Sequence, residues 1–144
     1  MITDTRKRVL AIDYGSKRIG IAISDPLYLF PSITITLKND KNVFINVLKI
    51  IVEKNIDKII LGYPHNENKS TVQLAKEIIK FKDELELKSK IKVELWDEEL
   101  TSQMAAERII MSVTRKSKRR DKALVDAQSA AIILEEYLKS LEQK

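Results

Sequence analysis

The chain has 144 residues, a formal net charge of +5 and no cysteine. Without cysteine it has no disulfide framework, no thiolate metal site and no cysteine nucleophile. No stretch approaches the ~18 uninterrupted apolar residues of a membrane span, and the polar start carries no signal-like segment. We therefore expect a soluble, cytoplasmic protein that makes no membrane contact and folds as one domain over residues 1–144.

The first part of the chain predicts a meander of three strands. Apolar runs indicate strands at residues 8–14 and 18–24, and Gly15-Ser16-Lys17 between them is typical of a hairpin. Alternating polar and apolar residues indicate a third strand at 32–38, at or near a sheet edge. Asn39 or Asp40 is expected to cap a helix whose apolar positions extend from Phe44 to Ile51.

The later elements alternate between strands and helices. We expect a buried strand at 58–63, a helix that begins with a capping box at Ser70 and Gln73, and a strand at 91–95. A helix from Thr101 or Ser102 to about Met111 and a final helix with an apolar stripe over 124–141 follow. This order predicts an α/β sheet that is antiparallel at one side and parallel at the other.

The positive charge is concentrated in one segment near the end of the chain. Six basic residues surround the single acid Asp121, and they are Arg115, Lys116, Lys118, Arg119, Arg120 and Lys122. This segment alone carries the +5, because the rest of the chain has 20 basic and 20 acidic residues. It predicts contact with a polyanion, and the alternative is a solvated surface loop.

Three positions place an acid at the end of a predicted strand or near the start of a predicted helix. Asp13 ends an apolar run, one of Asp97, Glu98 and Glu99 ends the strand at 91–95, and Asp126 lies near the start of the last helix. Carboxylates that converge at the carboxyl ends of strands need a cation, and oxygen ligands favour Mg²⁺ or Mn²⁺. Two such ions can activate water against a phosphodiester, so the pattern predicts a metal-dependent nuclease.

Each acid also has a structural interpretation. Asp13 could accept backbone amides in a turn, and Asp126 could complement the helix dipole. Spacing does not choose among the three acids that follow the strand at 91–95. His65 is the only histidine, so histidine-based triads and zinc sites are not expected.

Four ordered motifs resemble the YqgF family of Holliday-junction-resolvase-like nucleases over nearly the whole chain. They occupy residues 13–22, 62–64, 97–101 and 126–131. The resemblance implies a ribonuclease-H-like fold with a five-stranded mixed sheet, three strands antiparallel and two parallel. It also implies Asp13, Glu98 and Asp126 as the metal-binding and catalytic acids. The chain departs from the family pattern at Glu99, where arginine is usual, and at residues 65–69.

The resemblance also implies that the protein processes the 5′ end of the 16S rRNA precursor, in ribosomal precursor particles. The leading hypothesis is therefore a metal-dependent nuclease that acts on structured RNA, with Mg²⁺ or Mn²⁺ as a two-ion cofactor. Lys17, Arg18 and the six basic residues of the segment would hold phosphates of structured RNA. One alternative is a homodimer that resolves four-way DNA junctions. Another is a nucleic-acid-binding protein without catalysis, which the Glu99 departure favours. Monomer and homodimer both remain open.

Overall fold

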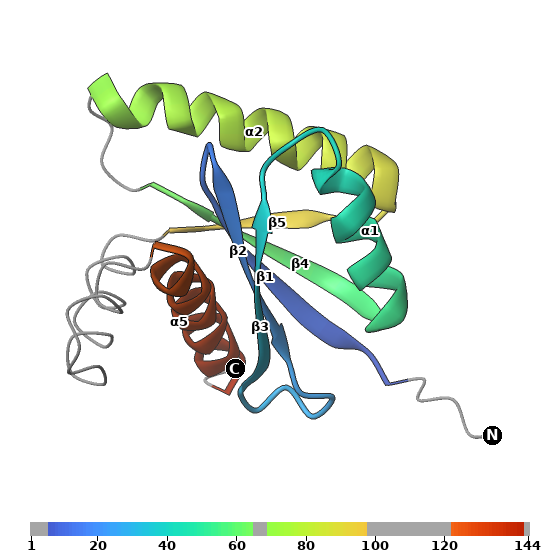
Figure 1. The fold of residues 1–144 in the computed structure, drawn as a ribbon. Helices are drawn as coiled ribbons and strands as arrows, with labels where there is room; N and C mark the ends of the chain where they lie inside the picture. The colour runs from blue at the N-terminus through green and yellow to red at the C-terminus, as the bar shows by residue number, and fades with distance from the viewer. Residues whose placement is uncertain (1–5, 65–68, 98–121, 143–144) are drawn as a thin grey trace.

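The computed structural model describes residues 6–64, 69–97 and 122–142, apart from the side chains of 69–70 and 122–124. Its elements form a five-stranded sheet with helices on both faces (Figure 1). They are β1 (Arg8–Tyr14), β2 (Arg18–Ser24), β3 (Pro31–Lys38), α1 (Val43–Glu53), β4 (Ile56–Tyr63), α2 (Lys69–Ser89), β5 (Val93–Asp97) and α5 (Lys122–Glu142). No helix in these ranges is long and apolar enough to cross a membrane.

The strand order is β3-β2-β1-β4-β5. The first three strands form an antiparallel meander, while β4 pairs in parallel with β1 and β5 pairs in parallel with β4. The expected mixed sheet is therefore confirmed, with β3 at an edge. Because β1, β4 and β5 are parallel, their carboxyl ends meet at one edge of the sheet, where ligands gather in folds of this kind.

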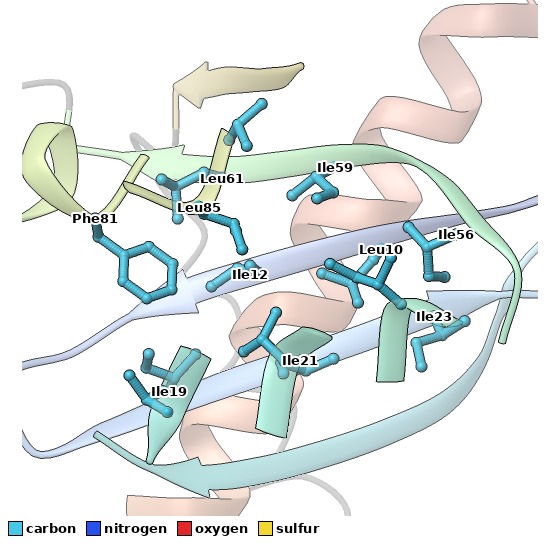
Figure 2. Packing of buried hydrophobic residues seen from close by; sticks show 14 of the residues in the cluster. Leu10, Ile12, Ile19, Ile21, Ile23, Ile56, Ile59, Leu61, Phe81 and Leu85 are labelled. Atoms are coloured by element: carbon cyan, nitrogen blue, oxygen red, sulfur yellow. The ribbon is translucent and has the colours of Figure 1, made fainter. Parts of the chain in front are cut away.

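The two faces of the sheet carry side chains of different size. Alternate residues of β1 and β2 fill the face under α1 and α2 with leucine and isoleucine, as Figure 2 shows. The opposite face, under α5, has Val9, Ala11 and Ala22 on these two strands. Small side chains on that face allow the backbone of α5 to approach the sheet closely, which places the helix directly over β1 and β2.

Two helix starts differ from the sequence predictions. Helix α1 begins at Val43 after Asn42, whose side chain makes no capping hydrogen bond. Asp40 instead accepts a hydrogen bond from the backbone N–H of Asn42 at 2.9 Å, as an Asx turn, and Asn39 donates its side-chain amide to the carbonyl of Gly15 at 2.8 Å. Ser70 is already helical in α2, so the capping box was also wrong.

The connection between β2 and β3 is organised by a buried acid that the sequence pattern did not indicate. The carboxylate of Asp25 accepts hydrogen bonds from the backbone N–H groups of Leu27, Leu29 and Phe30 at 3.0, 2.7 and 2.9 Å. Burial alone raises the pKa of Asp25, but these three amides outweigh it and hold the pKa below 3.8.

Replacing Asp25 by alanine should lower the free energy of unfolding by at least about 1.5 kcal/mol, the cost of one charge-assisted hydrogen bond. Asp25→Asn should cost less, because one oxygen can still accept from Leu29 and Phe30. Since the folded pKa lies below the unfolded value, this stabilisation is present above about pH 4 and is lost as pH falls through the folded pKa. Urea denaturation at pH 7 and pH 3 measures both effects; equal stability of wild type and Asp25→Ala at pH 7 would contradict them.

Candidate active site

Asp13 lies near the carboxyl end of β1, on the face of the sheet that α5 covers. Side chains alternate along a strand, so Asp13 shares its face with Val9 and Ala11. It is half-buried, and its partner across the antiparallel pair is Gly20 of β2. Asp13 is therefore held by the strand register at the edge where β1, β4 and β5 end.

Gly20 allows the backbone of α5 to rest on the sheet opposite Asp13. A Cβ atom built on Gly20 would lie 2.0 Å from the carbonyl oxygen of Asp126 and 2.5 Å from its carbonyl carbon. These are helix backbone atoms, which cannot move aside as a flexible side chain could. Because Gly20 pairs with Asp13, the contact holds Asp126 over the strand next to Asp13, on the same face of the sheet. The structure thus brings together two of the three acids chosen from sequence.

Arg18 joins this arrangement as a partner of Asp126. It lies two residues before Gly20 and hence on the same face of β2, and its Nε atom donates to Oδ2 of Asp126 at 3.1 Å. The two side chains are 33% and 25% exposed. From the sequence Arg18 was expected to contact phosphate, whereas in the structure it neutralises one of the candidate metal-binding carboxylates.

Strand β5 ends at the same edge of the sheet, and its side chains contact α5. The indole N–H of Trp96 donates to Oε2 of Glu136 at 3.1 Å, and its ring packs edge-on against Tyr137 with centroids 5.6 Å apart. Trp96 thus faces α5, so the next residue, Asp97, faces the other side of the sheet. This argues against Asp97 as the partner of Asp13 and leaves Glu98 or Glu99.

Most of the remaining predicted residues lie outside the described part of the chain. These are Glu98, Arg115, Lys116, Lys118, Arg119 and Arg120, together with the side chain of Lys122. Lys17 is exposed in the turn between β1 and β2, whose shape is fixed because Asn39 binds the carbonyls of both Gly15 and Lys17. Within the described ranges, no three acids or histidines come close enough to form a metal site.

Gly20 was not among the residues predicted from sequence, although a signal for it was present. A glycine inside an otherwise apolar strand often marks a close approach of another backbone. Trp96 and Glu136 were also missed, because nothing in their local sequence shows that two residues 40 positions apart form a hydrogen bond.

Comparison with known proteins identifies the family. The model of the RuvX family, described as Holliday junction resolvase, matches residues 7–140. The chain belongs to the RuvX family. This membership confirms the resemblance to resolvase-like nucleases that the four motifs indicated.

Curated relatives resemble this RuvX-family chain over most of its length. One from Phocaeicola vulgatus is 36% identical over 134 residues, which is 92% of this chain and 96% of the relative. Another from Azobacteroides pseudotrichonymphae is 40% identical over 136 residues, or 93% and 97% of the two chains. Both bear the name "Putative pre-16S rRNA nuclease".

Solved structures share the fold of this RuvX-family member at low sequence identity. The RuvC protein of T. thermophilus in complex with a Holliday junction substrate has a TM-score of 0.61 and 12% identity, covering 94% of this chain and 96% of RuvC. The fowlpox virus resolvase in complex with junction DNA has a TM-score of 0.56 and 16% identity, covering 93% and 98%. The fold is thus the ribonuclease-H-like fold expected from the motifs.

Proposed function

We propose that this chain is a metal-dependent nuclease that hydrolyses phosphodiester bonds in structured RNA, with the 5′ end of the 16S rRNA precursor as its substrate. The observation that supports the proposal is the contact at Gly20: the backbone of Asp126 lies against Gly20, and Gly20 pairs with Asp13 near the carboxyl end of β1. The relatives named as nucleases of this precursor support the choice of substrate. We place the reaction in the cytoplasm, on ribosomal precursor particles.

The donor set at this edge fits Mg²⁺ or Mn²⁺. Asp13 and Asp126 offer carboxylate oxygens, the ligands that hard divalent cations prefer, and neither cysteine nor histidine lies among the site residues. We assign Glu98 as the third acid, because β5 ends at this edge and Asp97 faces away. A bound pair of ions supplies Lewis-acid activation of the phosphodiester and of the attacking water.

The chain's own cations would bind and orient the substrate. Arg18 holds the Asp126 carboxylate at 3.1 Å and, being one-third exposed, can also reach a phosphate oxygen. Lys17 projects from a turn that Asn39 keeps fixed. The basic segment over residues 115–122 leads into α5 in the sequence, and we propose that its charge draws the RNA backbone toward the acids.

A cleavage assay tests the proposal. Purified protein is incubated with labelled 16S rRNA precursor and, separately, with a four-way DNA junction, each in Mn²⁺ and in chelator. We expect Mn²⁺-dependent cleavage of the precursor. Binding of both substrates without cleavage of either would instead support the non-catalytic alternative that Glu99 favours.

A second candidate function is resolution of four-way DNA junctions. The family description and the two resolvase complexes of similar fold favour it. Symmetric cutting of two strands requires two active sites, so this function requires a homodimer, whereas a monomer suffices for RNA. Faster cleavage of the junction than of the precursor, by a protein that sediments as a dimer, would select it.

Neutralising the basic segment should change how RNA binding depends on salt. Replacing one arginine or lysine in residues 115–122 by glutamine should reduce the slope of log affinity against log salt by roughly 0.7 to 0.9 for each phosphate that the protein no longer neutralises. Lys49→Gln, an exposed charge on α1, is the matched control and should leave the slope unchanged. Binding titrations at several salt concentrations measure the slope. An unaltered slope after substitution in the basic segment would show that the segment is not part of the binding surface.

A further inference from the structure

A groove on the α2 side of the sheet lies at the same edge as the candidate active site. It has a volume of about 400 Å³ and is lined by Tyr63 at the end of β4 and by Val72, Ala75, Lys76 and Ile79 of α2. Val72 and Ile79 are 40% and 37% exposed, although both are apolar. Tyr63 is the last residue of β4, so the groove lies at the carboxyl end of that strand, and Figure 1 shows that α2 extends past this end.

The strand register fixes the distance between this groove and the acids. Ile12 of β1 pairs with Leu61 of β4. Two residues further along each strand, Tyr63 is therefore in register with Tyr14, the residue after Asp13. Neighbouring strands lie about 4.8 Å apart. The groove is therefore one strand away from Asp13, on the opposite face of the sheet. A nucleic-acid strand that passes over the edge could contact both.

The chemistry of the lining suits one kind of occupant. An aromatic ring beside aliphatic side chains offers a surface on which a nucleobase can stack, and Lys76 offers a charge for the phosphate attached to it. The described lining contains no acid that would repel nucleic acid. A paired base cannot enter such a groove, because both of its faces are already stacked in the duplex.

We propose that this groove binds an unpaired nucleobase next to the scissile phosphate, with Tyr63 as the stacking residue and Lys76 as a phosphate contact. The proposal rests on the proposed nuclease function and narrows its substrate class. The preferred substrate carries single-stranded nucleotides beside the cleaved bond, and a continuous duplex binds less well. Tyr63 is here a specificity-determining residue and takes no part in the chemistry.

Binding measured without metal tests the groove separately from catalysis. The probes are an RNA hairpin with a short single-stranded 5′ extension that contains 2-aminopurine, the same hairpin with a blunt end, and the DNA version of each. In chelator, wild type should bind the extended hairpin more tightly and quench its fluorescence. Tyr63→Ala should weaken that binding by about 5- to 150-fold, the range measured for one stacked base, and should abolish the quenching. Tyr63→Phe should restore both.

A second variant keeps the test valid if Tyr63→Ala fails to fold. Val72→Glu places a negative charge in the groove at an exposed position and should remove the preference for the extension. Val52→Glu is the matched control, because Val52 is 76% exposed on α1 and lies outside the groove. The proposal is overturned if wild type shows no preference for the extension, or if Val72→Glu binds as Val52→Glu does. Failure of cleavage in Mn²⁺ with this preference intact would overturn the nuclease instead, and the DNA probes report whether the groove distinguishes the two nucleic acids.

Discussion

Gly20→Ala should lower the free energy of unfolding by about 1 to 3 kcal/mol, the usual cost of an overpacked core. The added methyl group would overlap the carbonyl of Asp126, only 2.0 Å away, and two backbones would have to separate to admit it. The rate of cleavage should also fall, by about 100-fold, because a displacement of about 1 Å between reacting groups is enough for such a loss. Urea denaturation and the cleavage assay measure the two effects on one preparation.

The control for Gly20→Ala is Thr34→Ala, an exposed position on the edge strand β3. A surface substitution of this kind should change stability by no more than about 0.5 kcal/mol and should leave cleavage unaltered. If Gly20→Ala were as stable and as active as Thr34→Ala, α5 would not rest on β2 at this position, and the juxtaposition of Asp13 and Asp126 would lose its support.

Asp13→Asn should reduce Mn²⁺-dependent cleavage by about 1000-fold, which corresponds to about 4 kcal/mol of lost transition-state stabilisation. Asparagine has nearly the same shape, so the fold and the binding of RNA in chelator should remain. The loss comes from the missing negative charge, because an amide oxygen binds a divalent cation more weakly than a carboxylate does. Single-turnover cleavage rates over a range of Mn²⁺ concentrations separate weaker metal binding from slower chemistry.

Asp97→Asn is the matched control, since it makes the same chemical change at the same edge of the sheet. Asp97 follows Trp96, which faces α5, and therefore faces away from Asp13. Its substitution should leave the cleavage rate within a few-fold of wild type. Equal losses from both substitutions would show that the rate responds to total charge at this edge, and Asp13 would no longer be distinguished as a ligand.

Local patterns predicted the strands well because each carries a complete signal of its own. The bounds of β1 and β2 agree with the prediction, since one apolar run ends at Asp13, the hairpin residues follow, and a second apolar run begins at Ile19. The predicted start of α1 was wrong because Asn39, Asp40 and Asn42 are all good capping residues. The choice among them depends on the contact of Asn39 with the hairpin, which local sequence does not encode.

The site was predicted less completely than the fold, for a physical reason. Asp13 could be selected because it ends an apolar run, and Asp126 because it lies near the start of the last helix within the fourth motif. The ion pair of Arg18 with Asp126 could not be foreseen, because it joins residues 108 positions apart and depends on how closely α5 packs on β2. Likewise, the face of the sheet on which Asp97 lies could be assigned only from the observed contact of Trp96 with Glu136.

The position of α5 in the chain has a consequence for the protein during its synthesis. The ribosome makes all five strands before α5, and until that helix emerges Ala11, Gly20 and Ala22 lack the cover that α5 gives them in the folded protein. A nascent chain at that stage carries Asp13 without Asp126. The two acids can meet only after α5 has been synthesised and has packed on Gly20, so the candidate active site is assembled later than the sheet that carries Asp13.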